Sequence, residues 1–169
     1  RPFDDFTFNG INGILLYLFG YVFTNLGAFA VVIAIENQTG KVNIKDYAGL
    51  IYRSPWLAAL LLIFLLSLTG IPPTLGFWGK YFVFGAAVQV RFFALLIVAL
   101  INSAIAAGYY LNIVRYMFFM PAEDETPLKV GPSLGIVFVV TFLAVLGLGI
   151  LPGQLIQWAT ESAQFLIQF

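Results

Sequence analysis

The chain has 169 residues, of which 61% are hydrophobic and only 9% are charged. Soluble domains contain about 45–50% apolar and about 25% charged residues, and a globular fold of this size could not cover so much apolar surface. The mean hydropathy of +0.96 agrees with this. The composition therefore predicts an integral membrane protein that has the lipid bilayer as its main surroundings.

Charge and the missing residue types exclude several functions. Eight Lys and Arg balance eight Asp and Glu without any basic run, so nucleic acid is not expected as a partner. The chain has no Cys and no His, which excludes thiolate clusters, His-ligated haem and His-based zinc sites within it. We therefore expect no metal and no bound cofactor in this chain, and any redox chemistry would belong to another subunit.

The first residues do not have the pattern of a complete protein. The chain starts at Arg1 without an initiator Met, and without the basic start and short apolar core of a signal peptide. We therefore expect a fragment that lacks its N-terminal part. No repeat, low-complexity run or internal linker divides the sequence, so residues 1–169 are expected to form a single transmembrane domain.

Apolar stretches of sufficient length predict four membrane spans, because a spanning helix needs about 20 mainly apolar residues. The expected helices cover residues 12–35, 56–69 joined to 75–89, 92–119 and 133–151. The second stretch is too long for one straight helix and contains Pro72-Pro73, which removes two backbone donors. The sequence therefore predicts an all-α, polytopic membrane helix bundle with one discontinuous helix.

The tail at 154–168 is too polar to span a bilayer. Its apolar residues recur at helical spacing, which predicts an amphipathic helix that lies at the membrane interface.

Basic residues set the expected orientation, since cytoplasmic loops carry more Lys and Arg. The loops after the first and third spans hold Lys41, Lys45, Arg53, Arg115 and Lys129, against Arg1 and Arg91 on the other side. We therefore expect these loops in the cytoplasm and the C-terminus on the outer side.

The break in the second span is the most informative segment. Non-helical backbone at membrane depth survives only where it is buried in protein or lines a water-filled cavity. An ammonium near the bilayer centre costs at least about 2.5–3.5 kcal/mol, yet Lys80 follows soon after the break. Two costly features so close together indicate a single site. The residues expected to support the break are Gly70, Pro72, Pro73, Gly76 and Gly79.

Lys80 is the candidate proton-relay residue. Burial disfavours the charged form of an amine, so a lysine can lose and regain a proton where an arginine stays charged. In the alternative interpretation, Lys80 extends to the membrane interface and only anchors the helix.

Other polar residues within the spans carry weaker signals. Asn102 and Ser103 lie in the middle of the third span, ahead of Tyr109 and Tyr110, and could hydrogen-bond a file of water molecules, with Tyr109 as the third candidate. Contact between helices through small and polar residues explains them equally well. Glu36 stands where the first span ends, which favours a solvated carboxylate at the interface.

Four blocks of sequence resemble the antiporter-like subunits of respiratory complex I, those of the subunit N family most of all. They are NLGAF at 25–29, DYAGL at 46–50, LSLTGIPPTLGFWGK at 66–80 and YYLNIVR at 109–115. The resemblance extends over essentially the whole chain, in the family's order and spacing. It implies the end of the second of two inverted repeats, with a fold of about fourteen helices in full members.

By this resemblance, Lys80 matches the lysine of the family's discontinuous helix 12, where the sister subunit M usually has glutamate. The implied function is proton translocation by a membrane subunit of bacterial NADH–quinone oxidoreductase, in the plasma membrane and beside other membrane subunits. NADH, flavin, iron–sulfur clusters and quinone would then bind other subunits. Two alternatives remain: a subunit of a multi-subunit cation/proton antiporter, and a structural spacer in which Lys80 is inert.

Overall fold

The computed structural model describes residues 8, 10–122, 126–128 and 130–167, without the side chain at 167. Arg1 and Lys129, which contribute to the count of basic residues, and the end of the tail at 168 lie outside the described residues. The elements in chain order are α1 (Gly10–Thr39), η1 (Ile44–Tyr47), α2 (Leu50–Arg53), α3 (Pro55–Thr69), α4 (Leu75–Gln89), α5 (Phe93–Phe119), α6 (Pro132–Phe142), η2 (Leu143–Gly147), α7 (Leu148–Ile150) and α8 (Gly153–Ile167).

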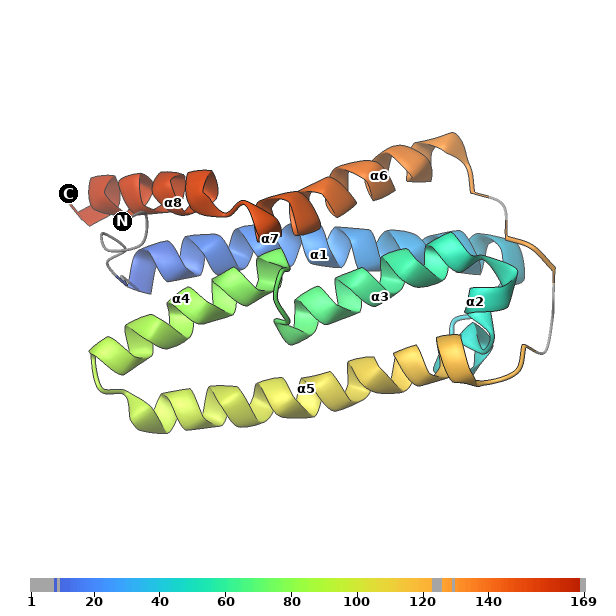
Figure 1. Cartoon of the computed structure of the whole chain (residues 1–169), viewed down its shortest axis with the longest axis horizontal. Helices are drawn as coiled ribbons and strands as arrows, with labels where there is room; N and C mark the ends of the chain where they lie inside the picture. The colour runs from blue at the N-terminus through green and yellow to red at the C-terminus, as the bar shows by residue number, and fades with distance from the viewer. Residues whose placement is uncertain (1–7, 9, 123–125, 129, 168–169) are drawn as a thin grey trace.

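The helices lie side by side along one long axis (Figure 1). Both α1 and α5 extend along the whole bundle, and α3 and α4 together follow the same course between them, with the break near the middle. The run from α6 to α8 lies along the other side of α1. The all-α membrane bundle with a discontinuous helix, predicted from the sequence, is confirmed.

By length and composition, three helical stretches of the described residues could cross a membrane: Gly10–Thr39, Phe93–Phe119 and Pro132–Ile150. The helices α3 and α4 are each 15 residues long, too short to cross a bilayer alone. Joined end to end, they cover the length that one continuous span would need.

Glycines bring α1 close to the broken helix. Gly13, Gly20 and Gly27 are spaced seven residues apart on α1, so they lie on one face. A Cβ on Gly13 would lie 3.1 Å from the backbone nitrogen of Val83 in α4, and one on Gly27 would collide with the Phe64 ring in α3. The missing side chains therefore allow α1 to pack tightly against both halves of the broken helix.

The helix α5 packs differently from α1. Met117 is the only buried residue of α5. One apolar core is built mainly from α1, α3 and the loop after α1, with Met117 of α5 and Phe138 of α6 at its sides, and a second lies around Leu16, Leu75 and Phe82 near the break. One side of the broken helix is thus packed against α1, while α5 covers the other side more loosely.

The helix α8 forms where the sequence predicts an amphipathic tail. Figure 1 shows α8 continuing in the direction of α6 and lying beside the first half of α1. Its stripe of Leu155, Ile156, Ala159 and Ala163 is buried, and the first three of these join the core cluster around Leu16. These four residues of the apolar stripe are therefore covered by protein, while Leu166, farther along α8, is exposed.

Candidate functional site

The break between α3 and α4 leaves two backbone carbonyls without helical donors. In a continuous helix the carbonyls of Leu68 and Thr69 would accept hydrogen bonds from residues 72 and 73. Both of those residues are proline and have no N–H. The chain turns away at Gly70, whose φ of +88° is a left-handed conformation that suits glycine. The last turn of α3 therefore offers two free acceptors in the middle of the bundle.

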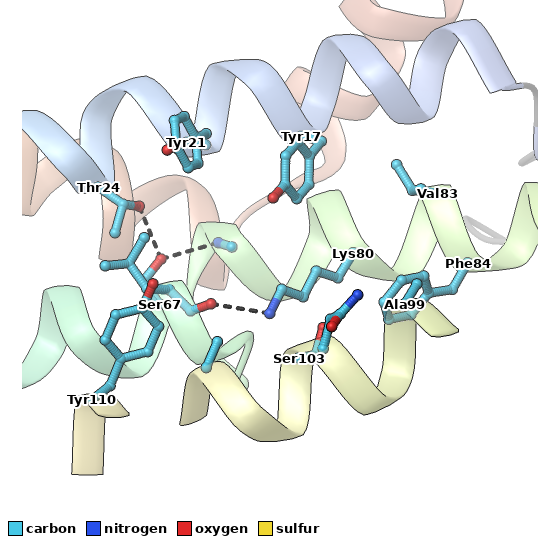
Figure 2. Close-up of a pocket in the computed structure, with 15 residues that line it drawn as sticks. Tyr17, Tyr21, Thr24, Ser67, Lys80, Val83, Phe84, Ala99, Ser103 and Tyr110 are labelled. Atoms are coloured by element: carbon cyan, nitrogen blue, oxygen red, sulfur yellow. Dashed lines mark hydrogen bonds between the residues drawn. The ribbon is translucent and has the colours of Figure 1, made fainter. Parts of the chain in front are cut away.

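The side chain of Lys80 supplies the missing donors. Its Nζ donates to the carbonyl oxygen of Leu68 at 3.0 Å and to that of Thr69 at 2.8 Å. The C-terminal end of a helix carries partial negative charge, which favours an ammonium there. Figure 2 shows the side chain extending from α4 toward the end of α3. The ammonium thus lies at the break, in the middle of the bundle.

The glycines near the break make room for this contact. A Cβ on Gly70 would lie 2.8 Å from Cδ of Lys80, so any other residue there would displace the lysine. On Gly76 a Cβ would collide with the carbonyl oxygen of Ser67, and on Gly79 it would lie 2.8 Å from Cα of Tyr17. At these three glycines the two half-helices, α1 and the lysine lie too close together to leave room for a side chain.

A short chain of hydroxyl groups connects the start of α4 with α1. The backbone N–H of Gly76 donates to Oγ of Ser67 at 3.1 Å, and this oxygen shares a hydrogen bond of 3.0 Å with the hydroxyl of Thr24. Both hydroxyl-bearing residues are buried. The backbone N–H of Gly76, in the first turn of α4, gains an acceptor in this way. Polar groups thus connect the break with α1.

Lys80 faces a cavity of about 380 Å³ between α1, the break and α5. Its polar lining residues are Tyr17, Tyr21 and Thr24 from α1, Ser67 from α3, Lys80 from α4, and Asn102, Ser103 and Tyr110 from α5. Among the described residues that line it, Lys80 is the only charged one. The cavity is large enough for several water molecules, each of which takes up about 30 Å³ in the liquid.

The structure brings two of the three residues predicted along a water path next to Lys80 and places the third elsewhere on α5. Asn102 and Ser103 line the cavity with Lys80. Tyr109 is 69% exposed and does not line it, whereas its neighbour Tyr110 does. Successive residues of a helix point about 100° apart, which is why the two adjacent tyrosines face different surroundings here.

Sequence reasoning missed other residues of the lining, among them Tyr17, Tyr21, Thr24 and Ser67. The spacing of four between the two tyrosines is a signal for a shared helix face. Nothing in the sequence shows that this face lies opposite Lys80.

A second interruption lies directly against the first. The chain breaks between α7 and α8 at Leu151 and Pro152, and the carbonyl of Gly149 accepts a hydrogen bond of 2.7 Å from Nε1 of Trp78. A Cβ on Gly149 would lie 2.8 Å from Cα of Thr74, the residue that precedes α4. The start of α4 is thus held from the α7 side as well as from α1.

Comparisons with known proteins agree with this geometry. The family model described as "NADH:quinone oxidoreductase/Mrp antiporter, TM" matches residues 6–106, which include Lys80. NADH-quinone oxidoreductase subunit N of Desulforamulus reducens is 42% identical over 160 residues, covering 94% of this chain and 33% of the relative. Subunit N 2 of Roseiflexus castenholzii is 46% identical over 144 residues, covering 85% and 29%.

A chain of respiratory complex I from Thermus thermophilus, solved with bound aureothin, is similar with a TM-score of 0.71 and 33% identity, over 87% of this chain and 34% of that chain. The chain thus spans about a third of the length of the curated relatives it matches. These findings confirm the resemblance drawn from the four sequence blocks. The chain belongs to the NADH:quinone oxidoreductase/Mrp antiporter transmembrane family.

Proposed function

We propose that the chain forms the C-terminal third of a proton-translocating membrane subunit of NADH–quinone oxidoreductase. In this proposal Lys80 takes up and releases the proton. The observation that carries it is the position of the Lys80 ammonium. It donates to the carbonyls of Leu68 and Thr69 and lies beside a cavity with further polar side chains. The relatives named subunit N and the similarity to a complex I chain support it.

The arrangement suits a residue that changes its protonation state. As an ammonium, Lys80 donates to two carbonyls; after giving a proton to water in the cavity, the neutral amine can accept another from a different direction. The carbonyls hold the nitrogen in the same place in both states, because an amine also carries N–H donors. Quinone reduction in other subunits would drive the cycle by changing the charge around the cavity, which alters the energy of the ammonium.

The surroundings of this subunit follow from the same proposal. The host would be a bacterial plasma membrane, with the loops at 36–54 and 115–132 in the cytoplasm and the C-terminal tail on the outer side. Other membrane subunits would be its partners, and it would act within the translocase without a redox site of its own. NADH, flavin, iron–sulfur clusters and quinone would bind those other subunits.

Replacing Lys80 tests the proposal directly. In the complex that contains this chain, we expect Lys80→Met to abolish or sharply reduce the protons pumped per electron in membrane vesicles. Lys41→Met is the matched control, because Lys41 is exposed in the loop after α1. An unchanged proton-to-electron ratio in the Lys80 variant would leave a structural spacer with an inert lysine as the better description.

A second candidate is a subunit of a multi-subunit cation/proton antiporter. The observation that favours it is the description of the matching family, which includes both NADH:quinone oxidoreductase and an antiporter. The two candidates differ in what drives transport. Proton movement that depends on NADH oxidation and quinone reduction supports the first, and sodium-dependent proton exchange without quinone reduction supports the second.

A further inference from the structure

The end of α3 and the start of α4 hold each other through side chains. A helix leaves its first N–H groups and its last carbonyls without partners inside the helix. At the end of α3, the carbonyls of Leu68 and Thr69 receive their donors from Lys80, which belongs to α4. At the start of α4, the backbone N–H of Gly76 finds its acceptor in Oγ of Ser67, which belongs to α3. Each half-helix thus supplies a cap for the other.

Ser67 does what the residue before a helix usually does. A threonine at that position normally accepts a hydrogen bond from the N–H of the second or third helical residue. Before α4 this residue is Thr74, but it makes no such bond, and its hydroxyl donates to the carbonyl of Ile71 at 2.7 Å. Gly76 is the second residue of α4, so the cap comes from α3 instead of the adjoining chain. Ser67 therefore fixes the start of α4 relative to the end of α3.

The main chain of Ser67 belongs to the same turn as the acceptors of Lys80. Its carbonyl accepts a hydrogen bond from the N–H of Gly70 at 3.0 Å, which closes the end of α3. Leu68 and Thr69 are the next two residues of the chain, within one helical turn of Ser67. A displacement of Ser67 relative to α4 therefore also displaces both acceptors relative to the ammonium.

The hydroxyl of Ser67 is held in turn by Thr24 of α1, with 3.0 Å between the two oxygens (Figure 2). Within the described helices, the other threonines donate to the carbonyl four residues earlier: Thr39, Thr69, Thr141 and Thr160. In that part of the chain Thr24 makes no such bond, and its hydroxyl bonds that of Ser67. Both residues are only 1% exposed, and a buried hydroxyl is costly without a partner. The two hydroxyls therefore depend on each other.

We propose that Ser67 is a positioning residue for Lys80, and that Thr24 orients its hydroxyl. Ser67 acts through the backbone, because it keeps the end of α3 where the ammonium reaches both carbonyls. This inference rests on the proposed function, since the position of Lys80 matters for transport only if this residue carries the proton.

A cap that does not titrate is useful next to a residue that does. Among the described residues, Ser67 and Lys80 are the only side chains that hydrogen-bond one half-helix to the other. The bonds from Lys80 weaken when the ammonium loses its proton, because a neutral donor forms weaker hydrogen bonds than a charged one. The bond between Ser67 and the N–H of Gly76 does not change, so it holds the half-helices in place throughout the cycle.

Substitutions that keep the shape of the site test the proposal in the assembled complex, in membrane vesicles. Thr24→Val replaces the hydroxyl with a methyl group, whereas Thr24→Ser keeps the hydroxyl. Ser67→Ala removes the acceptor of the Gly76 N–H. The matched control is Thr141→Val, because Thr141 is also buried and its hydroxyl bonds carbonyls of its own helix, α6.

We expect Ser67→Ala and Thr24→Val to lower the protons pumped per electron toward the value of Lys80→Met, with assembled complex near the wild-type amount. Thr24→Ser and Thr141→Val should keep the wild-type ratio. A residue that only supports folding would lower the amount of complex and leave the ratio unchanged. A wild-type ratio in Ser67→Ala or in Thr24→Val, or equally low ratios in the two Thr24 variants, would overturn the proposal. If Ser67→Ala does not assemble, the two Thr24 variants decide.

The Lys80→Met variant separates this inference from the proposed function. If Lys80→Met lowers the ratio while Ser67→Ala and Thr24→Val do not, the positioning role is wrong and the function stands. If Lys80→Met leaves the ratio unchanged, both are wrong.

Discussion

The ammonium of Lys80 lies 2.8 Å from the carbonyl oxygen of Thr69, where the proline four residues later cannot supply a backbone donor. The same holds for the carbonyl of Leu68, 3.0 Å from the ammonium. The prolines that break the helix therefore also create the acceptors that hold the lysine. The break and Lys80 therefore depend on each other, and we expect a substitution in either of them to disturb the other.

The first prediction separates the charge of Lys80 from its ability to titrate. Lys80→Arg keeps a cation that can donate to both carbonyls, but a guanidinium does not give up its proton in proteins. We expect normal amounts of assembled complex and a fall in proton pumping by about tenfold or more, because a fixed charge cannot relay. Assembly is measured by native gel electrophoresis and pumping by fluorescence quenching in vesicles.

Lys80→Met serves as the comparison, because it removes the donors as well and leaves two carbonyls unsatisfied. It should lower the amount of complex more than Lys80→Arg does. Pumping at the wild-type level in the arginine variant would show that the residue acts only as a fixed positive charge.

The second prediction concerns the contact between the two half-helices. In Gly76→Ala the new Cβ would collide with the backbone carbonyl of Ser67, which cannot move as a side chain can. We expect a loss of about 1–3 kcal/mol or more in the free energy of unfolding, from overpacking. Thermal denaturation of the purified complex measures it. Gly135→Ala is the control, since no atom lies within 4 Å of a Cβ there.

Much of the fold could be predicted because membrane helices have a strong sequence signal. Apolar stretches show the spans, and two consecutive prolines show the break, since their effect on backbone donors does not depend on the tertiary structure. Lys80 was identifiable for the same reason, as a charge inside an apolar stretch. The direction of its side chain was not, because it depends on how α3 and α4 lie relative to each other.

Two other features show where sequence reasoning reaches its limit. The few polar residues of α5 do not mark a single face, so the sequence does not indicate which side meets the cavity, and Tyr109 could not be told from Tyr110. The stripe on α8 indicates burial of Leu155 and Ile156, but lipid and protein cover such a stripe equally well. In both cases the missing information is which helices are neighbours.

The third prediction concerns Tyr47 in the loop after α1. Its raised pKa means that the folded state holds a proton that the unfolded chain loses near pH 10. The stability from the neutral hydroxyl is therefore complete below about pH 10 and decreases as the pH rises from there through the folded-state pKa. We expect Tyr47→Phe to lose less stability than wild type between about pH 8 and pH 11.

The melting temperature of the purified complex at the two pH values measures this effect. Tyr52→Phe is the control, because Tyr52 lies nearby in α2 and is 75% exposed. An alkaline fall in melting temperature that is the same in wild type and in the Tyr47 variant would contradict the prediction.

The last prediction tests whether the second interruption stabilises the first. Trp78→Phe keeps an aromatic ring but removes the N–H that donates to the carbonyl of Gly149, a buried residue at the end of α7. Leaving that carbonyl without its donor should cost about 1–3 kcal/mol in the free energy of unfolding. Trp158→Phe is the matched control, because that indole is 56% exposed on α8. Since Trp78 lies in the first turn of α4, the helix that carries Lys80, its loss should also lower proton pumping. Equal stability of the two variants would show that α4 is held at its start by α1 alone.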